Sequence, residues 1–275
     1  QDTVEPVHAE GDLWRYTGTH WESINEMNLR QEIHALEGAR FGRNGKLKIM
    51  KPFIDGVISE LAAMCHAPDF FAAAPIGVNC ENGFLTINHG GDITIEQHQP
   101  EHAQRDFSTH WWNPHCSEHP PKLRDLLTVC FEENANEISK TILEFIGLAL
   151  TGSHHLMRQP KAMIFHGPSG ANGKSTLQQV MEGIMPSGSV SHVSPDSFSN
   201  EQYVVGLIGK KLNLSDEVPK NKELQSDRFK ALITGDPVMG KRVYRNPFSF
   251  KSKAMHVFAA NNLPSFSHID GGLTR

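Results

Sequence analysis

The sequence has few cysteines, and they do not form a familiar redox or zinc motif. Its 275 residues include four, Cys65, Cys80, Cys116 and Cys130, with no pair in C-x-x-C spacing. A disulfide scaffold is therefore not indicated, and thiols kept reduced in a cytoplasm are the favoured interpretation. A zinc site drawn from His115, Cys116, His119 and Cys130 is the alternative, but its spacing is irregular.

Long apolar runs and an excess of positive charge are also missing. No stretch approaches the ~20 apolar residues of a membrane-spanning helix, so we expect no contact with a membrane. There are 26 Lys and Arg against 31 Asp and Glu, giving a formal net charge of −5. This excludes a protein coated in basic surface, although it leaves room for a local nucleic-acid contact.

The rest of the composition is ordinary for a globular chain. With 38% hydrophobic and 21% charged residues, the chain has room for one large domain or two modest ones. It starts at Gln1 without a methionine or signal peptide and stops at Arg275 without completing an element. We therefore expect an excised piece of a longer protein, with sequence missing beyond Arg275.

The most informative stretch is rich in glycine and contains one lysine. An apolar run at 162–165 precedes it, and a helical pattern that includes Leu177, Met181 and Ile184 follows. Strand, glycine-rich turn and helix, with Gly-Lys-Ser at the helix start, are typical of a phosphate-binding P-loop. A solvated surface turn is the alternative. The predicted nucleotide-binding residues are Gly167, Ser169, Gly170, Ala171, Asn172, Gly173, Lys174, Ser175 and Thr176.

These residue types suit a triphosphate for physical reasons. Glycines let backbone N–H groups converge on phosphate oxygens, and the helix N-terminus adds the positive end of its dipole. We predict that Lys174 reaches the β- and γ-phosphates of ATP and that the Ser175 hydroxyl binds Mg²⁺. Strict spacing would put Pro168 at the first glycine position, where proline cannot adopt a positive φ. We therefore expect Gly167 to begin a turn that is one residue longer.

Two acidic residues follow an extended run at 210–215. At the carboxyl end of a parallel strand beside the P-loop strand, Asp216 is expected to bind Mg²⁺, directly or through water. Glu217 is the predicted catalytic residue that polarises the attacking water. Because Asn213 and Ser215 make this strand half polar, an acidic pair in an exposed loop is the alternative.

A second apolar run, 257–260, ends in Asn261. A strand that ends in asparagine presents a neutral amide, and we predict that Asn261 contacts the γ-phosphate and the attacking water. An ordinary Asn-Asn turn before Pro264 is the alternative.

A basic hairpin is predicted between these two motifs. From Pro237 through Ile269 the sequence contains no Asp or Glu, while five Lys and Arg residues fall there. Unopposed cations on one hairpin form a local surface for the phosphates of DNA. An edge hairpin with solvated lysines is the alternative. The predicted DNA-binding residues are Lys241, Arg242 and Arg245.

The first half of the chain is predicted to be mixed and mostly helical. Alternating aromatics at 14–16, a turn at 17–18 and Trp21 indicate a hairpin. A half-buried sheet face is the commoner use of such aromatics, and stacking on a single-stranded base is the alternative. Helices are predicted near 25–37, 51–64, 123–131 and 137–150. We expect the apolar stripe of the second helix to pack in the core and the basic residues 43–51 to form a solvated loop.

These elements predict an α/β fold with two domains. The core is a P-loop (AAA+-like) ATPase with a central parallel sheet, preceded by a smaller, mostly helical α+β domain. Glycine and proline at 151–160 indicate the boundary. Residues 1–155 are then the N-terminal accessory domain, and residues 156–275 are the ATPase domain, truncated at its carboxyl end.

The motifs together resemble superfamily 3 helicases, specifically the helicase part of the phage and plasmid primase–helicase family related to poxvirus primase–helicases. Residues 170–176 are similar to that family's P-loop, and the pair 216–217 to its Walker B end. Residues 230–236 resemble the segment before its DNA-binding hairpin, and 261–264 its sensor. In the first half, residues 14–21 and 82–87 resemble the domain that precedes the ATPase.

This resemblance implies an assembly and a biological setting. It implies a hexameric ring around single-stranded DNA, with ATP at the subunit interfaces and the basic hairpins lining the channel. Residues 270–275 resemble the start of the segment that carries the family's arginine finger, which implies a catalytic role for Arg275 in the neighbouring subunit. A primase domain would precede Gln1, and the protein would replicate a phage or a mobile element.

The leading hypothesis is an ATP-hydrolysing DNA helicase or translocase. A small-substrate P-loop phosphotransferase, in other words a kinase, is one alternative, but it would not need an acid-free basic hairpin. A nucleotide-switched DNA-binding initiator or loader without unwinding is the other.

Overall fold

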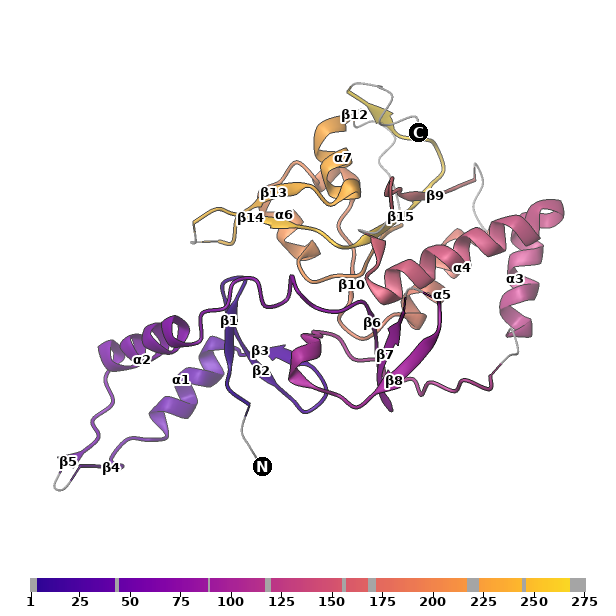
Figure 1. Ribbon diagram of the computed structural model, residues 1–275. Helices are drawn as coiled ribbons and strands as arrows, with labels where there is room; N and C mark the ends of the chain where they lie inside the picture. The colour runs from indigo at the N-terminus through magenta and orange to yellow at the C-terminus, as the bar shows by residue number, and fades with distance from the viewer. Residues whose placement is uncertain are drawn as a thin grey trace. The chain divides into compact units, whose positions relative to one another are not determined.

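The computed structural model describes residues 4–42, 45–88, 90–116, 120–154, 157–167, 172–216, 223–243 and 246–267. It divides into two compact units: Gln1–Pro75 with Asn82–Phe107, and Ile76–Glu81 with Ser108–Arg275 (Figure 1). The predicted domain boundary between residues 155 and 156 falls inside the second unit and stays a prediction. No helix in the described part of the chain is long and apolar enough to cross a membrane.

The second unit is built on a parallel sheet, as predicted. Its strands are β9 (Met163–His166), β10 (Val190–Ser191), β11 (Leu212–Ser215) and β15 (Met255–Ala260), in the order β10-β11-β15-β9. All three pairings are parallel. The carboxyl ends of β9, β11 and β15 therefore lie at the same edge of the sheet.

The strand order corrects one expectation. We predicted that the strand ending before Asp216 would lie beside the P-loop strand, and this is wrong, because β15 lies between them. All six residues of β15 are buried, which suits a position with neighbours on both sides. The carboxylate and the P-loop thus lie on either side of the strand that ends before Asn261.

Helices cover both faces of this sheet. One core cluster joins the sheet to α3 (Pro121–Phe131), α4 (Ala135–Thr151) and α5 (Lys174–Ile184). The other contains residues of α6 (Glu201–Val204) and α7 (Ser226–Thr234). On β15, Val257 belongs to the first cluster and Phe258 to the second, and successive side chains of a strand point to opposite faces. The arrangement is a three-layered α/β structure.

The polar residues of β11 are buried and satisfied. The Asn213 Oδ1 accepts hydrogen bonds from Ser191 Oγ and from the Val193 backbone N–H, both at 2.8 Å. Its Nδ2 donates to the Val193 carbonyl at 2.9 Å and lies 3.2 Å from His256 Nδ1. A buried amide with these partners carries no desolvation penalty for unpaired groups, so a half-polar strand is accommodated inside the sheet.

His256 on β15 gives this region a predictable response to pH. Burial lowers the pKa of His256 from 6.5 to about 3; the neighbouring His154 adds to the lowering, and a hydrogen bond with the Leu232 backbone opposes it. Between these two pH values the unfolded chain binds a proton that the folded chain excludes. Stability is therefore lost as the pH falls from about 6.5 towards 3, by about 1.4 kcal/mol per pH unit for one such group.

We expect His256→Gln to reduce the loss of unfolding free energy that occurs as the pH falls. Urea unfolding of both proteins at several pH values measures it, because contributions of other groups cancel in the difference. The unfolding free energy of the variant relative to the wild type should rise steadily as the pH falls from 6.5 to 4.5. A difference that is constant over this range would show that His256 protonates in the folded protein.

The second unit also contains the predicted hairpin and two short strand pairs. The hairpin consists of β13 (Pro237–Gly240) and β14 (Phe248–Lys251). Strands β12 (Glu223–Leu224) and β16 (Ser265–Phe266) pair in parallel. Strand β6 (Gly77–Cys80) belongs to this unit as well.

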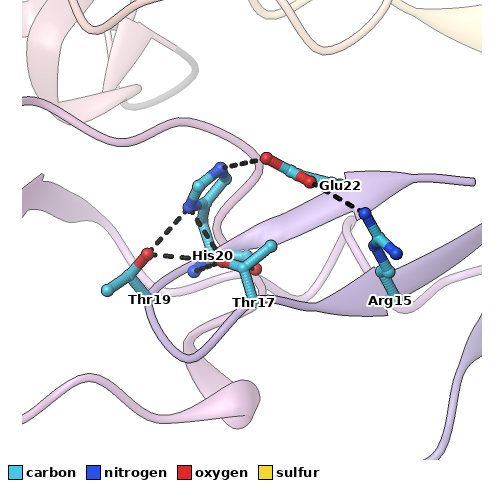
Figure 2. A network of polar contacts seen from close by, with 5 residues as sticks. All are labelled: Arg15, Thr17, Thr19, His20 and Glu22. Atoms are coloured by element: carbon cyan, nitrogen blue, oxygen red, sulfur yellow. Dashed lines mark hydrogen bonds and ion pairs between the residues drawn. The ribbon is translucent and has the colours of Figure 1, made fainter.

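The first unit begins with an antiparallel sheet of β1 (Val7–Ala9), β2 (Asp12–Tyr16) and β3 (Trp21–Ser23). The predicted hairpin is confirmed, with Tyr16 opposite Trp21. Figure 2 shows polar contacts along it, in which His20 lies near the Thr17 and Thr19 hydroxyls and Glu22 lies between His20 and Arg15. Trp21 is buried in a core cluster and donates from Nε1 to the Pro100 carbonyl, so the aromatics form a sheet face.

The remaining elements of this unit are helical or short. They are α1 (Glu26–His34), β4 (Arg40–Phe41), β5 (Gly45–Lys46), α2 (Lys51–Met64), β7 (Gly83–Ile87) and β8 (Ile93–Glu96). The bounds predicted for α2 are confirmed, but its predicted inner face is wrong. Phe53, Val57 and Met64 are exposed, Met64 to 83%, and Ile54 is the buried residue. Helical periodicity located an apolar face without showing which side packs.

Candidate nucleotide-binding site and basic hairpin

Lys174, the lysine of the predicted P-loop, donates hydrogen bonds to two other residues of that loop. Strand β9 ends at His166, and the backbone N–H of Gly167 donates to the carbonyl of Ala260 at 3.1 Å. The Lys174 ammonium donates to the Gly167 carbonyl at 3.1 Å and to Asn172 Oδ1 at 2.8 Å. A Cβ on Gly167 would lie 2.3 Å from Asn172 Nδ2. Gly167 thus has no room for a side chain, while the longer turn that we expected from Pro168 falls on residues 168–171, outside the described ones, and stays a prediction.

The helix that follows begins without a capping side chain. Gly173 is its N-cap residue, with a φ of +81°, and no acidic residue lies in the first turn. The N-terminus of this helix carries the positive end of the helix dipole. The side chains of Ser175 and Thr176 are exposed in this turn. A Cβ on Gly173 would also lie 2.5 Å from Cys130 Sγ of α3, so two independent constraints favour glycine here.

Asp216 and Asn261 directly follow the other two strands. Asp216 comes after Ser215 of β11, and Asn261 after Ala260 of β15; both side chains are exposed. Since Ala260 pairs with His166, Asn261 and Gly167 leave neighbouring strands at the same level. Three strands thus lead to Gly167, Asp216 and Asn261 at one edge of the sheet, and Lys174 is hydrogen-bonded to Gly167. Six predicted residues lie outside the described ones: Ser169, Gly170, Ala171, Glu217, Arg245 and Arg275.

One residue that sequence reasoning missed links two parts of this site. Gln178 of α5 is buried, and its Nε2 donates to the Ser215 carbonyl at 3.0 Å. The bond ties the P-loop helix to the peptide unit immediately before Asp216. The available signal was a glutamine between Leu177 and Met181, on the buried face of a helix.

The geometry fits ATP and Mg²⁺. A loop ending in a glycine N-cap, an uncapped helix N-terminus and a lysine ammonium suit the phosphates. The Ser175 hydroxyl and the Asp216 carboxylate are hard oxygen ligands of the kind that Mg²⁺ takes alongside substrate phosphates and water. Among the described residues no group of three or more His, Cys, Asp or Glu side chains is placed to hold a metal ion; the alternative zinc site includes His119, which lies outside them.

The basic hairpin extends away from the parallel sheet of its unit (Figure 1). Its base is anchored, because Val238 is buried and Phe250 packs against the second core cluster. The Lys241 backbone N–H donates to the Glu201 carbonyl of α6 at 3.0 Å, while its side chain is exposed. The Arg242 guanidinium lies 5.9 Å from the centre of the Phe248 ring. The hairpin is thus presented to solvent, with Val243 60% exposed.

A continuous path joins the site to this hairpin. Strand β12 precedes α7 and pairs with β16, which follows Asn261 along the chain. The Ser267 N–H donates to the Leu224 carbonyl at 3.0 Å, and the Ser226 and Ser267 hydroxyl oxygens lie 3.2 Å apart. Helix α7 starts at Ser226 and ends before Gly235, which leads into β13.

Comparison with known proteins supports the fold. A family of unknown function (DUF5906) matches residues 165–275, and no curated protein matches the chain. The apo structure of the NrS-1 C-terminal region (305–718) is 15% identical, with a TM-score of 0.53, over 98% of this chain and 55% of that one. An A-form apo structure of the same region is 16% identical, with a TM-score of 0.52, over 95% and 54%.

This chain therefore spans about half the length of those structures. At such low identity the similarity shows a shared fold and no more. It agrees with the predicted α/β class and its central parallel sheet.

Proposed function

We propose that this protein is an ATP-hydrolysing DNA helicase or translocase. The observation that carries the proposal is the shared edge of the parallel sheet, which assembles Lys174, Ser175, Asp216 and Asn261. The same unit presents an acid-free basic hairpin to solvent. A nucleotide site and a polyanion-binding surface on one unit are the two parts that such a motor needs.

Each residue has a role that follows from its chemistry. Bound ATP with Mg²⁺ would supply the phosphoanhydride bond that is cleaved. The Lys174 ammonium would neutralise charge on the β- and γ-phosphates, and Ser175 with Asp216 would hold the metal. Glu217 would accept a proton from the attacking water, and the Asn261 amide would orient that water. Gln178 would keep the P-loop helix in register with Asp216.

The path through β12, β16 and α7 supports a coupling role. Movement of the segments after Asp216 or Asn261 would pass to the β12–β16 pair and then to α7. Because α7 leads directly into β13, the hairpin would shift with the state of the nucleotide. That shift would move the bound DNA.

Assembly and context extend this proposal. We place six copies in a ring around single-stranded DNA, with Arg275 of one copy reaching the ATP of its neighbour. We also propose that a primase domain or partner precedes Gln1 and that the protein acts in replication of a phage or mobile element. The particle mass measured by light scattering with ATP and single-stranded DNA tests the ring. A monomer under those conditions would exclude it for this chain.

The hairpin provides the test of function. We expect Lys241→Ala/Arg242→Ala/Arg245→Ala to abolish the stimulation of ATP hydrolysis by DNA and to leave hydrolysis without DNA unchanged, because the hairpin lies outside the nucleotide site. Lys122→Ala/Lys140→Ala/Lys161→Ala is the matched control, since it removes three other exposed cations.

The outcomes separate the alternatives. A phosphotransferase would show no DNA effect in the wild type, and a DNA-binding initiator would show stimulation without strand displacement. Retained stimulation in the hairpin variant would exclude the hairpin as the DNA contact.

A further inference from the structure

A second acid-free basic stretch lies in the first unit. From Gly38 to Ile54 the sequence contains no Asp or Glu and five cations. We expected residues 43–51 to form a solvated loop, but the structure places β5 and the start of α2 within them. Strands β4 and β5 pair and form the tip of an arm whose sides are α1 and α2 (Figure 1).

The cations of this tip repel one another. Arg40 lies directly opposite Lys46 in the β4–β5 register, and like charges in that position destabilise a strand pair. Lys48 and Lys51 follow on the same segment. All four side chains are exposed. We call Arg40, Lys46, Lys48 and Lys51 the arm tip; Arg43 lies outside the described residues.

The arm neutralises a cation on its helix α1 and leaves those at its tip. Arg30 lies 2.8 Å from Glu26 and 2.7 Å from Asp55. Its hydrogen bonds to Asp55 and then Glu26 raise the pKa of Arg30. By contrast, no ion pair within the described part of the chain joins an arm-tip cation to a carboxylate.

The backbone holds the tip in place. The Gly38 N–H donates to the Leu47 carbonyl at 2.9 Å, and the Leu47 N–H to the Ala39 carbonyl at 2.8 Å. The nearest acid in sequence, Glu37, accepts from the Ile49 N–H at 2.6 Å. The charges are therefore displayed on an ordered hairpin, which lowers the entropy cost of binding a ligand.

We infer that the arm tip binds the phosphate backbone of a nucleic acid. Clustered, uncompensated cations on a narrow ribbon are suited to a polyanion, and they supply affinity without reading sequence. The choice of nucleic acid over another polyanion rests on the proposed function. The protein would then hold polynucleotide at two places, the β13–β14 hairpin and the arm tip.

Direct binding without nucleotide tests this inference. Fluorescence anisotropy with single-stranded, duplex and forked oligonucleotides, over a series of salt concentrations, compares Arg40→Ala/Lys46→Ala/Lys48→Ala with Lys122→Ala/Lys140→Ala/Lys161→Ala. The slope of log K against log salt is negative, and we expect its magnitude to fall by about 3 in the arm-tip variant, about 1 for each lost phosphate contact. The three oligonucleotides show which form of nucleic acid the tip prefers.

Two further measurements keep the test decisive. Combining the arm-tip changes with Lys241→Ala and Arg242→Ala should lower the magnitude of this slope by the sum of the two separate decreases. A phosphate contact shared by the two sites would give a smaller decrease. Equal slopes for the arm-tip variant and its control would overturn the inference. So would unchanged DNA binding with lost binding to vesicles of anionic lipid, which would assign the tip to a membrane surface.

The proposed function can fail while the inference about the arm tip still holds. Absence of ATP hydrolysis in the wild type would remove the motor and leave the binding result standing. If the triple variant is unstable, Lys46→Gln alone should lower the magnitude of the slope of log K against log salt by about 1.

Discussion

Lys174→Ala is expected to abolish ATP hydrolysis. The ammonium donates to the Gly167 carbonyl and to Asn172 Oδ1, so it is held by two residues of the loop that we propose binds the phosphates. Alanine removes the only side-chain cation in the described P-loop, residues 167 and 172–176. Losing one donor to developing negative charge lowers kcat by about 10²- to 10³-fold, and ATP binding should weaken as well. Steady-state hydrolysis and a titration with a fluorescent ATP analogue measure both effects.

Lys161→Ala is a suitable control for this prediction, because that lysine is exposed two residues before β9. It should behave as the wild type. Normal hydrolysis by Lys174→Ala would remove Lys174 from the site and make the loop a surface turn.

Glu217→Gln is expected to separate binding from hydrolysis. The substitution keeps the size of the side chain and removes its ability to accept a proton, so ATP and Mg²⁺ should still bind. Loss of a general base slows the chemical step by about 10²- to 10⁴-fold. Single-turnover hydrolysis, with ATP affinity measured on the same protein, gives the two quantities separately.

Asp216→Asn is the informative comparison. It removes a proposed metal ligand, so it should raise the Mg²⁺ concentration needed for activity, whereas Glu217→Gln should leave that requirement unchanged. Wild-type turnover by Glu217→Gln would place the catalytic carboxylate elsewhere in the chain.

The local motifs of the sequence predicted the strands that lead to Gly167, Asp216 and Asn261, but not the order of those strands in the sheet. Glycine, lysine and hydroxyl residues at a strand–helix junction indicate phosphate binding through local geometry alone. Strand order depends on pairing between residues far apart in the chain, and no local pattern encodes it.

Other differences have the same origin. Asn213 made a buried strand look unfavourable because its hydrogen-bond partners could not be identified from the sequence. Those partners, Ser191 and Val193, come from another strand and from the loop after it. The stripe of α2 was assigned to the core because periodicity shows an apolar face without its partner. Gln178 was overlooked because one polar residue in a helix carries no signal until its acceptor, the Ser215 carbonyl, is known.

The β12–β16 pair has a consequence for how force would travel. The chain leaves the sheet after Asp216 and again after Asn261, and these two exits rejoin a few residues later. Under the proposed function, displacement at either exit would reach the start of α7 through this one strand pair. The proposed motor would therefore pass changes at the Mg²⁺ ligand Asp216 and at the water-orienting Asn261 to the hairpin together. Each cleavage event would yield a single stroke.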